Sequence, residues 1–129
     1  SNQQADSAHY KFNNIDFNGP LQNNDFDFDL VIGPLNDFID IYQLSAKELS
    51  DELGNEQYEQ AERLMHNVAG VAGNFGGEQL MQGARKIEHR IQQHEKITEE
   101  QIADFTDELQ NFITAIELLT ERHSVKAVS

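Results

Sequence analysis

The sequence predicts an all-α protein, an antiparallel up-down bundle of four helices with an N-terminal arm. From about residue 34 onward, apolar residues recur at spacings of three and four, which is the period of one helix face. The connections between these stretches are short, and turn residues mark their ends. The chain has 129 residues, of which 38% are hydrophobic, and this suffices for one domain with a single modest core.

Residues 1–27 are rich in Asn, Gln and Asp and show no helical period. At the end of this segment, residues 25–30 alternate polar and apolar side chains as a strand would, but no second strand is predicted to pair with them. We therefore expect residues 1–27 to form a polar linker and N-terminal arm, extended or short-helical, with Phe26, Phe28 and Leu30 packing on the bundle. The bundle is expected to span residues 28–124, followed by a C-terminal tail, 125–129.

The first predicted helix runs from Gly33-Pro34 to Gly54, because proline suits the first turn of a helix. The second begins near Asn55, a favourable N-cap residue. The apolar stripe of the first helix comprises Leu35, Phe38, Tyr42, Ala46, Leu49 and Leu53, and that of the second Tyr58, Ala61, Met65, Val68 and Ala72.

The Gly76-Gly77 pair ends the second helix, and the short connection predicts an antiparallel hairpin with the third. Thr98 and Gln101 form a capping box at the start of the fourth helix. The stripe of the third helix comprises Leu80, Ala84, Ile87 and Ile91, and that of the fourth Ile102, Phe105, Leu109, Phe112, Ile113, Ile116 and Leu119.

Composition narrows the possible functions. The formal net charge of −14 repels phosphate backbones and anionic lipid surfaces, so we expect no nucleic-acid partner and no direct membrane contact. The chain lacks cysteine and any apolar run long enough to span a bilayer, and we expect it in the cytoplasm. It also lacks the Glu-x-x-His pairs of di-iron bundles and the Gly-Lys-Ser/Thr ending of a phosphate-binding loop, so neither a metal nor a cofactor is expected.

One histidine, His66, stands next to unusually small residues. Ala69, Gly70 and Gly73 follow it on the second predicted helix, and each glycine costs about 1 kcal/mol relative to alanine inside a helix. At about 100° per residue, His66 lies more than 90° from the centre of the apolar stripe, on the flank or outside. A histidine that another protein must approach closely would account for this arrangement.

The stretch His66–Gly76, read as His-Asn-Val-Ala-Gly-Val-Ala-Gly-Asn-Phe-Gly, resembles the signature of the histidine-containing phosphotransfer (HPt) domain. The helix pattern from about Leu35 to Arg122 is similar to that of the same family. The resemblance implies a phosphorelay intermediate, in which His66 accepts a phosphoryl group from a receiver-domain aspartate and passes it to a response-regulator aspartate.

Further residue roles follow from this resemblance. Family members commonly carry an acidic or amide residue 22 positions after the histidine, here Glu88, which is expected to orient the imidazole. A carboxylate that accepts the Nδ1 hydrogen would leave Nε2 unprotonated and more nucleophilic. The receiver-docking surface is expected to comprise Glu62, Ala69, Gly70, Gly73 and Arg85.

The partner implied by the resemblance is a receiver domain, which brings the Mg²⁺. The chain itself is expected to be a monomer and a phosphohistidine carrier, and not a turnover enzyme. We expect it to be the C-terminal module of a bacterial hybrid sensor histidine kinase, the cytoplasmic part of an inner-membrane protein, and a free-standing shuttle is the alternative.

The chain departs from the family pattern at Ala69, where most members carry a lysine that helps to hold the phosphoryl oxygens. The expected consequence is slower transfer or a shorter-lived phosphohistidine. The same departure keeps open a second interpretation, a non-catalytic HPt-like module that binds receivers without carrying phosphate.

Overall fold

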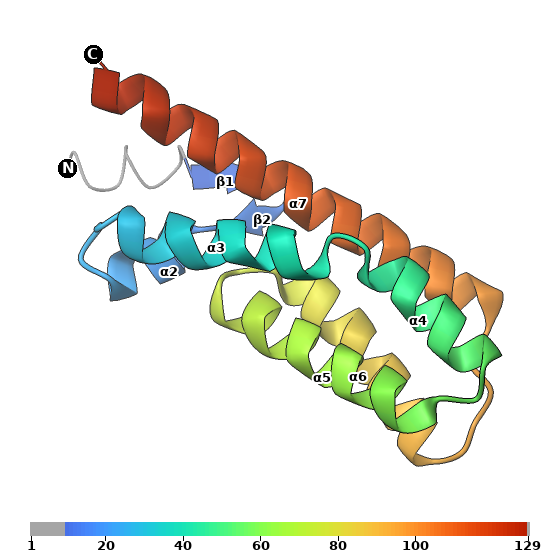
Figure 1. Ribbon diagram of the computed structural model, residues 1–129. Helices are drawn as coiled ribbons and strands as arrows, with labels where there is room; N and C mark the ends of the chain where they lie inside the picture. The colour runs from blue at the N-terminus through green and yellow to red at the C-terminus, as the bar shows by residue number, and fades with distance from the viewer. Residues whose placement is uncertain (1–9, 129) are drawn as a thin grey trace.

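The computed structural model describes residues 10–128, with side chains described as far as residue 125. It confirms the predicted all-α bundle (Figure 1). Its elements are β1 (Lys11–Phe12), β2 (Ile15–Asp16), α2 (Asn18–Asn23), α3 (Asp29–Tyr42), α4 (Ser45–Gly54), α5 (Tyr58–Asn74), α6 (Glu78–Gln92) and α7 (Glu99–Val128). Helices α3 and α4 together form the first arm of the bundle, and α5, α6 and α7 follow in alternating directions (Figure 1).

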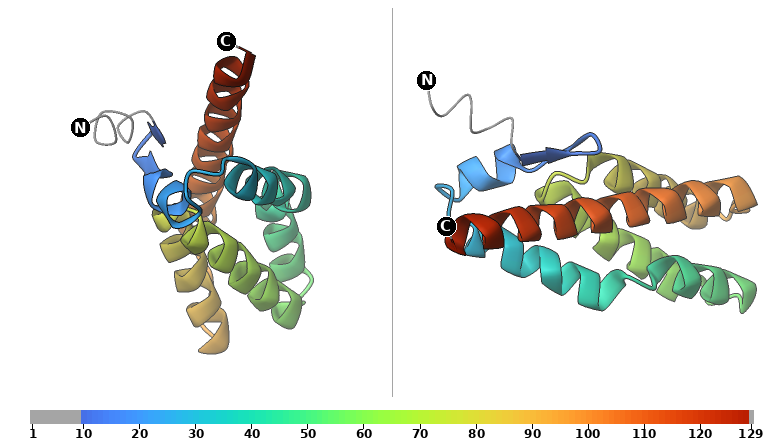
Figure 2. Two further views of the ribbon diagram at one scale, coloured as in Figure 1. Left: turned by 90° about the vertical axis from the view of Figure 1, so that its left-hand side faces the viewer. Right: turned by 90° about the horizontal axis from the view of Figure 1, so that it is seen from above.

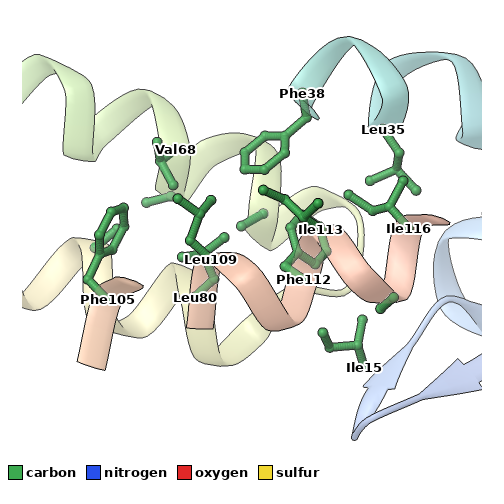
Figure 3. Packing of buried hydrophobic residues seen from close by; sticks show 14 of the residues in the cluster. Ile15, Leu35, Phe38, Val68, Leu80, Phe105, Leu109, Phe112, Ile113 and Ile116 are labelled. Atoms are coloured by element: carbon green, nitrogen blue, oxygen red, sulfur yellow. The ribbon is translucent and has the colours of Figure 1, made fainter. Parts of the chain in front are cut away.

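Helix α7 supplies the centre of the core. Its buried side chains lie among those of the other helices and of the N-terminal hairpin, which is formed by β1 and β2. Figure 3 shows this packing for four residues of α7, which face residues of α3, α6 and β2: Leu109, Phe112, Ile113 and Ile116 face Leu35, Phe38, Leu80 and Ile15. Each large apolar side chain that is fully buried contributes about 1.5–3 kcal/mol. The predicted capping box begins this helix, since the Gln101 amide N–H donates to Thr98 Oγ1 at 3.1 Å and the Thr98 N–H to Gln101 Oε1 at 3.0 Å.

The first predicted helix is in fact two helices, α3 and α4, and the first of them begins earlier than expected. Helix α3 starts at Asp29, whose N–H donates to Asp27 Oδ1 at 3.2 Å, and Pro34 lies inside it. The helix then breaks at Gln43-Leu44, and Ser45 at the start of α4 is fully buried. The break lets α3 pack on α7 while α4 packs on both α5 and α7. No glycine or proline marks this position, so the sequence carries no local signal for it.

The predicted start of the second helix at Asn55 is also wrong. Asn55 follows the last residue of α4, and its side-chain Nδ2 donates to the carbonyl oxygen of Asp51 at 2.8 Å. Glu56 then takes a left-handed conformation with φ of 58°, and α5 begins at Tyr58. Tyr58 was predicted to be in the core, but it is 51% exposed because it lies at the open end of the bundle.

The described part of the predicted linker is folded against the bundle. Strands β1 and β2 pair antiparallel, with Phe12 opposite Ile15, around a turn in which Asn13 and Asn14 have φ of 51° and 68°. Two residues with positive φ are what a tight hairpin turn requires, so Asn13-Asn14 was a signal in the sequence that the helical analysis missed. The apolar side chains of this segment are buried: Tyr10, Phe12, Ile15, Phe17 and Leu21.

The predicted C-terminal tail is a continuation of α7, which runs to Val128. The end of this helix and the N-terminal hairpin lie at the same end of the bundle (Figures 1 and 2). The Arg122 guanidinium carbon lies 4.7 Å from the centre of the Phe12 ring, and the His123 ring stacks on Phe28 at 4.7 Å. No helix in the described chain is both long enough and apolar enough to cross a membrane.

Candidate functional site

His66 lies in the middle of α5 on the side turned away from the core. Its side chain is 67% exposed, whereas Met65 and Val68 on the same helix are fully buried. The prediction that His66 lies outside the apolar stripe is therefore confirmed. An exposed imidazole can meet a group that another molecule presents.

Glu88 on α6 reaches the imidazole of His66. Its Oε2 atom lies 3.0 Å from His66 Nδ1, and its side chain is only 14% exposed. A carboxylate has no hydrogen to donate, so in this pair Nδ1 must carry the hydrogen when Glu88 is ionised. That tautomer leaves the lone pair on Nε2, for which the described chain supplies no hydrogen-bond partner.

A second bond between the same helices lies one turn away. Gln92 Nε2 on α6 donates to Glu62 Oε1 on α5 at 2.9 Å. Glu62 is four residues before His66, and Gln92 is four residues after Glu88, as antiparallel helices in register require. Glu62 was predicted to contact a receiver, and this bond also makes it part of the α5–α6 packing. Gln92 was missed, although counting four residues on from Glu88 would have identified it.

The two glycines after His66 stand in different surroundings. A Cβ atom at Gly70 would meet nothing within 4 Å, whereas a Cβ atom at Gly73 would lie 2.6 Å from Met81 Sδ on α6. Gly73 therefore makes room for Met81, a contact that sequence reasoning did not identify. Gly70 has no such neighbour, so packing within the described chain does not explain its missing side chain.

Ala69 does not lie on the exposed surface, and this prediction is wrong. Its exposed fraction is 0%. At 100° per residue Ala69 falls between His66 and the core stripe, on the side of α5 from which Glu62 and His66 reach α6. It is therefore covered by the packing of α6 on α5. Ala69 is only three residues after His66, but three residues along a helix leave its side chain 60° from the direction of His66, toward the core.

Among the basic residues around the site, Arg85 is exposed on α6, one turn before Glu88. By helical geometry it lies on the same side of α6 as Glu88. Arg90 points elsewhere, because it donates two hydrogen bonds to the Lys96 carbonyl oxygen at 3.2 and 2.8 Å and pairs with Glu95 at 3.2 Å. Arg85 is thus available to a partner approaching His66, and Arg90 holds the α6–α7 loop.

Within the described residues, no group of three or more His, Asp or Glu side chains converges in a way that could hold a metal ion. A neutral imidazole whose Nδ1 hydrogen is held by a carboxylate offers Nε2 as a nucleophile.

Comparison with protein families gives one match. The family model described as "Hpt domain" matches residues 35–118, which is more than half of the chain and includes both His66 and Glu88. Neither the curated proteins nor the solved structures include a match to this chain.

Proposed function

Because the chain belongs to the Hpt domain family, whose members carry out phosphotransfer in two-component signalling, we propose that His66 is its phosphoacceptor. In this proposal His66 Nε2 accepts a phosphoryl group from the aspartyl phosphate of a receiver domain and passes it to the aspartate of a response regulator. The observation that carries it is the exposed imidazole whose Nδ1 lies 3.0 Å from Glu88.

The proposed transfer needs few groups from this chain. The Nε2 lone pair attacks phosphorus, the bond from phosphorus to the aspartate oxygen breaks, and the carboxylate leaves with the electron pair. The phosphorylated ring keeps its Nδ1 hydrogen and so carries a positive charge, which the Glu88 carboxylate offsets. Onward transfer reverses these steps on the next aspartate.

Positioning and charge neutralisation do most of the work in phosphoryl transfer. The receiver supplies the aspartyl phosphate and its Mg²⁺, and the chain contributes an oriented nucleophile on a rigid helix pair. The proposed docking surface comprises Glu62, His66, Gly70 and Gly73 on α5, with Arg85 and Glu88 on α6. Ala69 is not part of it, because it is buried.

The deciding experiment measures acid-labile phosphate incorporated into the chain from a panel of phosphorylated receiver domains. We expect label in the wild type and none in His66→Gln. His89→Gln, which removes an exposed histidine of α6, is the matched control and should label normally. Label in His66→Gln would contradict the proposal. Receiver binding without any label in the wild type would favour the docking-only module.

A further inference from the structure

The N-terminal hairpin lies outside the residues that match the family, yet it has a fixed place on the bundle. Asn111 Nδ2 on α7 donates to the Asn13 carbonyl oxygen at 3.2 Å, and Arg122 covers the Phe12 ring. Ile15 and Phe17 are buried against the same core as the family domain. The N-terminal hairpin is therefore a rigid addition to the bundle.

The hairpin meets the turn that follows the His66 helix. Gly76 in this turn has φ of +94°, and a Cβ atom there would lie 2.5 Å from the Asp16 carbonyl oxygen. Only glycine fits both the left-handed backbone and this close approach. The α5–α6 turn and β2 are thus in direct contact.

A hollow of about 300 Å³ lies where the two segments meet. It is lined by Asn14 and Asp16 from the hairpin, Gly73 from α5, and Glu78 and Met81 from α6. Gly73 is two helical turns from His66, on the same face of α5 and about 10 Å along its axis. A protein interface of ordinary size covers about 800 Å² on each partner, roughly 30 Å across, so a receiver centred on His66 would reach the hollow.

The charge of the hollow indicates what it would accept. Asp16 and Glu78 are acidic, and none of the residues that line the hollow is basic. Asp16 Oδ1 accepts hydrogen bonds from the Asn18 N–H at 2.8 Å and from Asn18 Nδ2 at 2.6 Å, which fixes the carboxylate in place. A fixed carboxylate beside a second acidic side chain favours a lysine or arginine side chain.

We infer that the hairpin extends the receiver-docking surface beyond the family domain, and that the hollow between β2 and the α5–α6 turn takes a basic side chain of the receiver. This inference rests on the proposed function. Because the contact lies away from the reacting atoms, receivers that present a basic side chain to the hollow should bind more tightly than receivers that do not, with the same chemistry at His66.

The test uses the full chain and the receiver that labels His66 most efficiently in the assay above. The variant Asp16→Asn/Glu78→Gln removes both charges while keeping an oxygen acceptor at residue 16. Its matched control, Asp40→Asn/Glu117→Gln, makes the same charge change at exposed positions of α3 and α7. Dissociation constants are measured at low and physiological salt, and labelling by phosphoramidate checks that His66 still reacts.

We expect the hollow variant to weaken receiver binding at least fivefold at low salt, with less than a twofold change in the control. Labelling by phosphoramidate should be unchanged in both. Backbone amide resonances of Asn14 and Asp16 should shift when the receiver is added. Equal effects of the two variants, or no shift at Asn14 and Asp16, would overturn the inference while leaving His66 phosphorylation intact. Loss of receiver-dependent label in the wild type would instead overturn the proposed function and this inference with it.

Discussion

The pairing of His66 with Glu88 depends on the register of two helices and on the difference in their exposure. Glu88 is mostly covered and His66 mostly open, so the carboxylate is held by the protein while the ring remains accessible. The separation of 22 residues corresponds to one antiparallel step from α5 to α6 through the Gly76-Gly77 turn. We therefore interpret Glu88 as a positioning residue for the imidazole.

Replacing Glu88 by alanine should slow receiver-dependent phosphorylation of His66 by roughly 2- to 10-fold, because one hydrogen bond contributes about 0.5–1.5 kcal/mol. The Nδ1 hydrogen would lose its acceptor, and ¹⁵N spectra of the ring should show more hydrogen on Nε2. Glu88→Gln retains an oxygen acceptor, so its phosphorylation rate should fall between those of the wild type and Glu88→Ala. An unchanged rate together with an unchanged tautomer in Glu88→Ala would rule out this role.

Gly70 and Gly83 allow the proposed docking face to be tested with matched substitutions. Neither glycine has a neighbour within 4 Å of an added Cβ atom, and both lie in helix interiors. Gly70→Gln and Gly83→Gln should each stabilise the fold, by up to about 1 kcal/mol of helix propensity, in urea unfolding. Only Gly70→Gln should weaken receiver binding and slow transfer, since Gly70 is the one on the His66 face. Equal transfer rates in the two variants would show that the docking surface lies elsewhere.

At the scale of elements, the sequence predicted helices best where the apolar period is long and the turn chemistry is local. The stripes of α6 and α7 and the Thr98-Gln101 capping box are confirmed. The break at Gln43-Leu44 was not predictable, because tertiary packing on α7 and α5 decides it. The hairpin was missed because its strands are two residues long, too short for a visible period. For the site, the face of His66 was predictable and the burial of Ala69 was not, since burial depends on where α6 packs.

Helix α4 carries an acidic side chain in an unfavourable position. Burial raises the pKa of Glu52, and the nearby Glu48 carboxylate adds to the rise, while Glu52 Oε1 is buried without a hydrogen-bond partner in the described chain. Because the folded-state pKa of this carboxyl is raised, its contribution to stability is fully present only below its unfolded-state pKa, near 4.3–4.5. The contribution is lost as the pH rises through the folded-state pKa.

Glu52→Gln should therefore raise the Tm at pH 7 and change it little at pH 3.5, where Glu52 is protonated in both states. The measurement is thermal unfolding followed by circular dichroism at the two pH values. Glu117→Gln on the exposed face of α7 is the control and should show no such difference. A Tm gain of equal size at both pH values would mean that ionisation of Glu52 is not the cause.

At the scale of the whole molecule, the family domain and the segments flanking it share one core. Phe17 lies 18 residues before residue 35, where the family match begins, yet it is fully buried, with its ring centre 6.3 Å from that of Phe112. Asn36 Nδ2 also donates to Thr120 Oγ1 at 3.1 Å, which ties α3 to the last part of α7. The stability of the His66 surface should therefore depend on residues that the family pattern does not include.

Phe17→Ala should lower the free energy of unfolding by about 3–5 kcal/mol, the usual cost of removing a buried phenylalanine. Phe26→Ala is the control, because Phe26 is 37% exposed and belongs to the same N-terminal segment. Its cost should be clearly smaller in chemical denaturation. A loss below about 1 kcal/mol for Phe17→Ala would indicate that the segment contributes little to the shared core.

Ala69 is fully buried, and by helical geometry it lies on the side of α5 that faces α6, where its small side chain lets the two helices lie close together. A longer side chain there would act as a wedge and could separate the imidazole from the Glu88 carboxylate without altering either residue. Restoring the family's lysine by Ala69→Lys therefore changes two things at once, the charge near the phosphoryl group and the width of the gap between the two helices. Ala69→Met has a side chain of similar length without the charge. If the lysine prolongs the phosphohistidine half-life and the methionine shortens it, charge outweighs width at this position; if both shorten it, this chain has come to depend on the narrow gap.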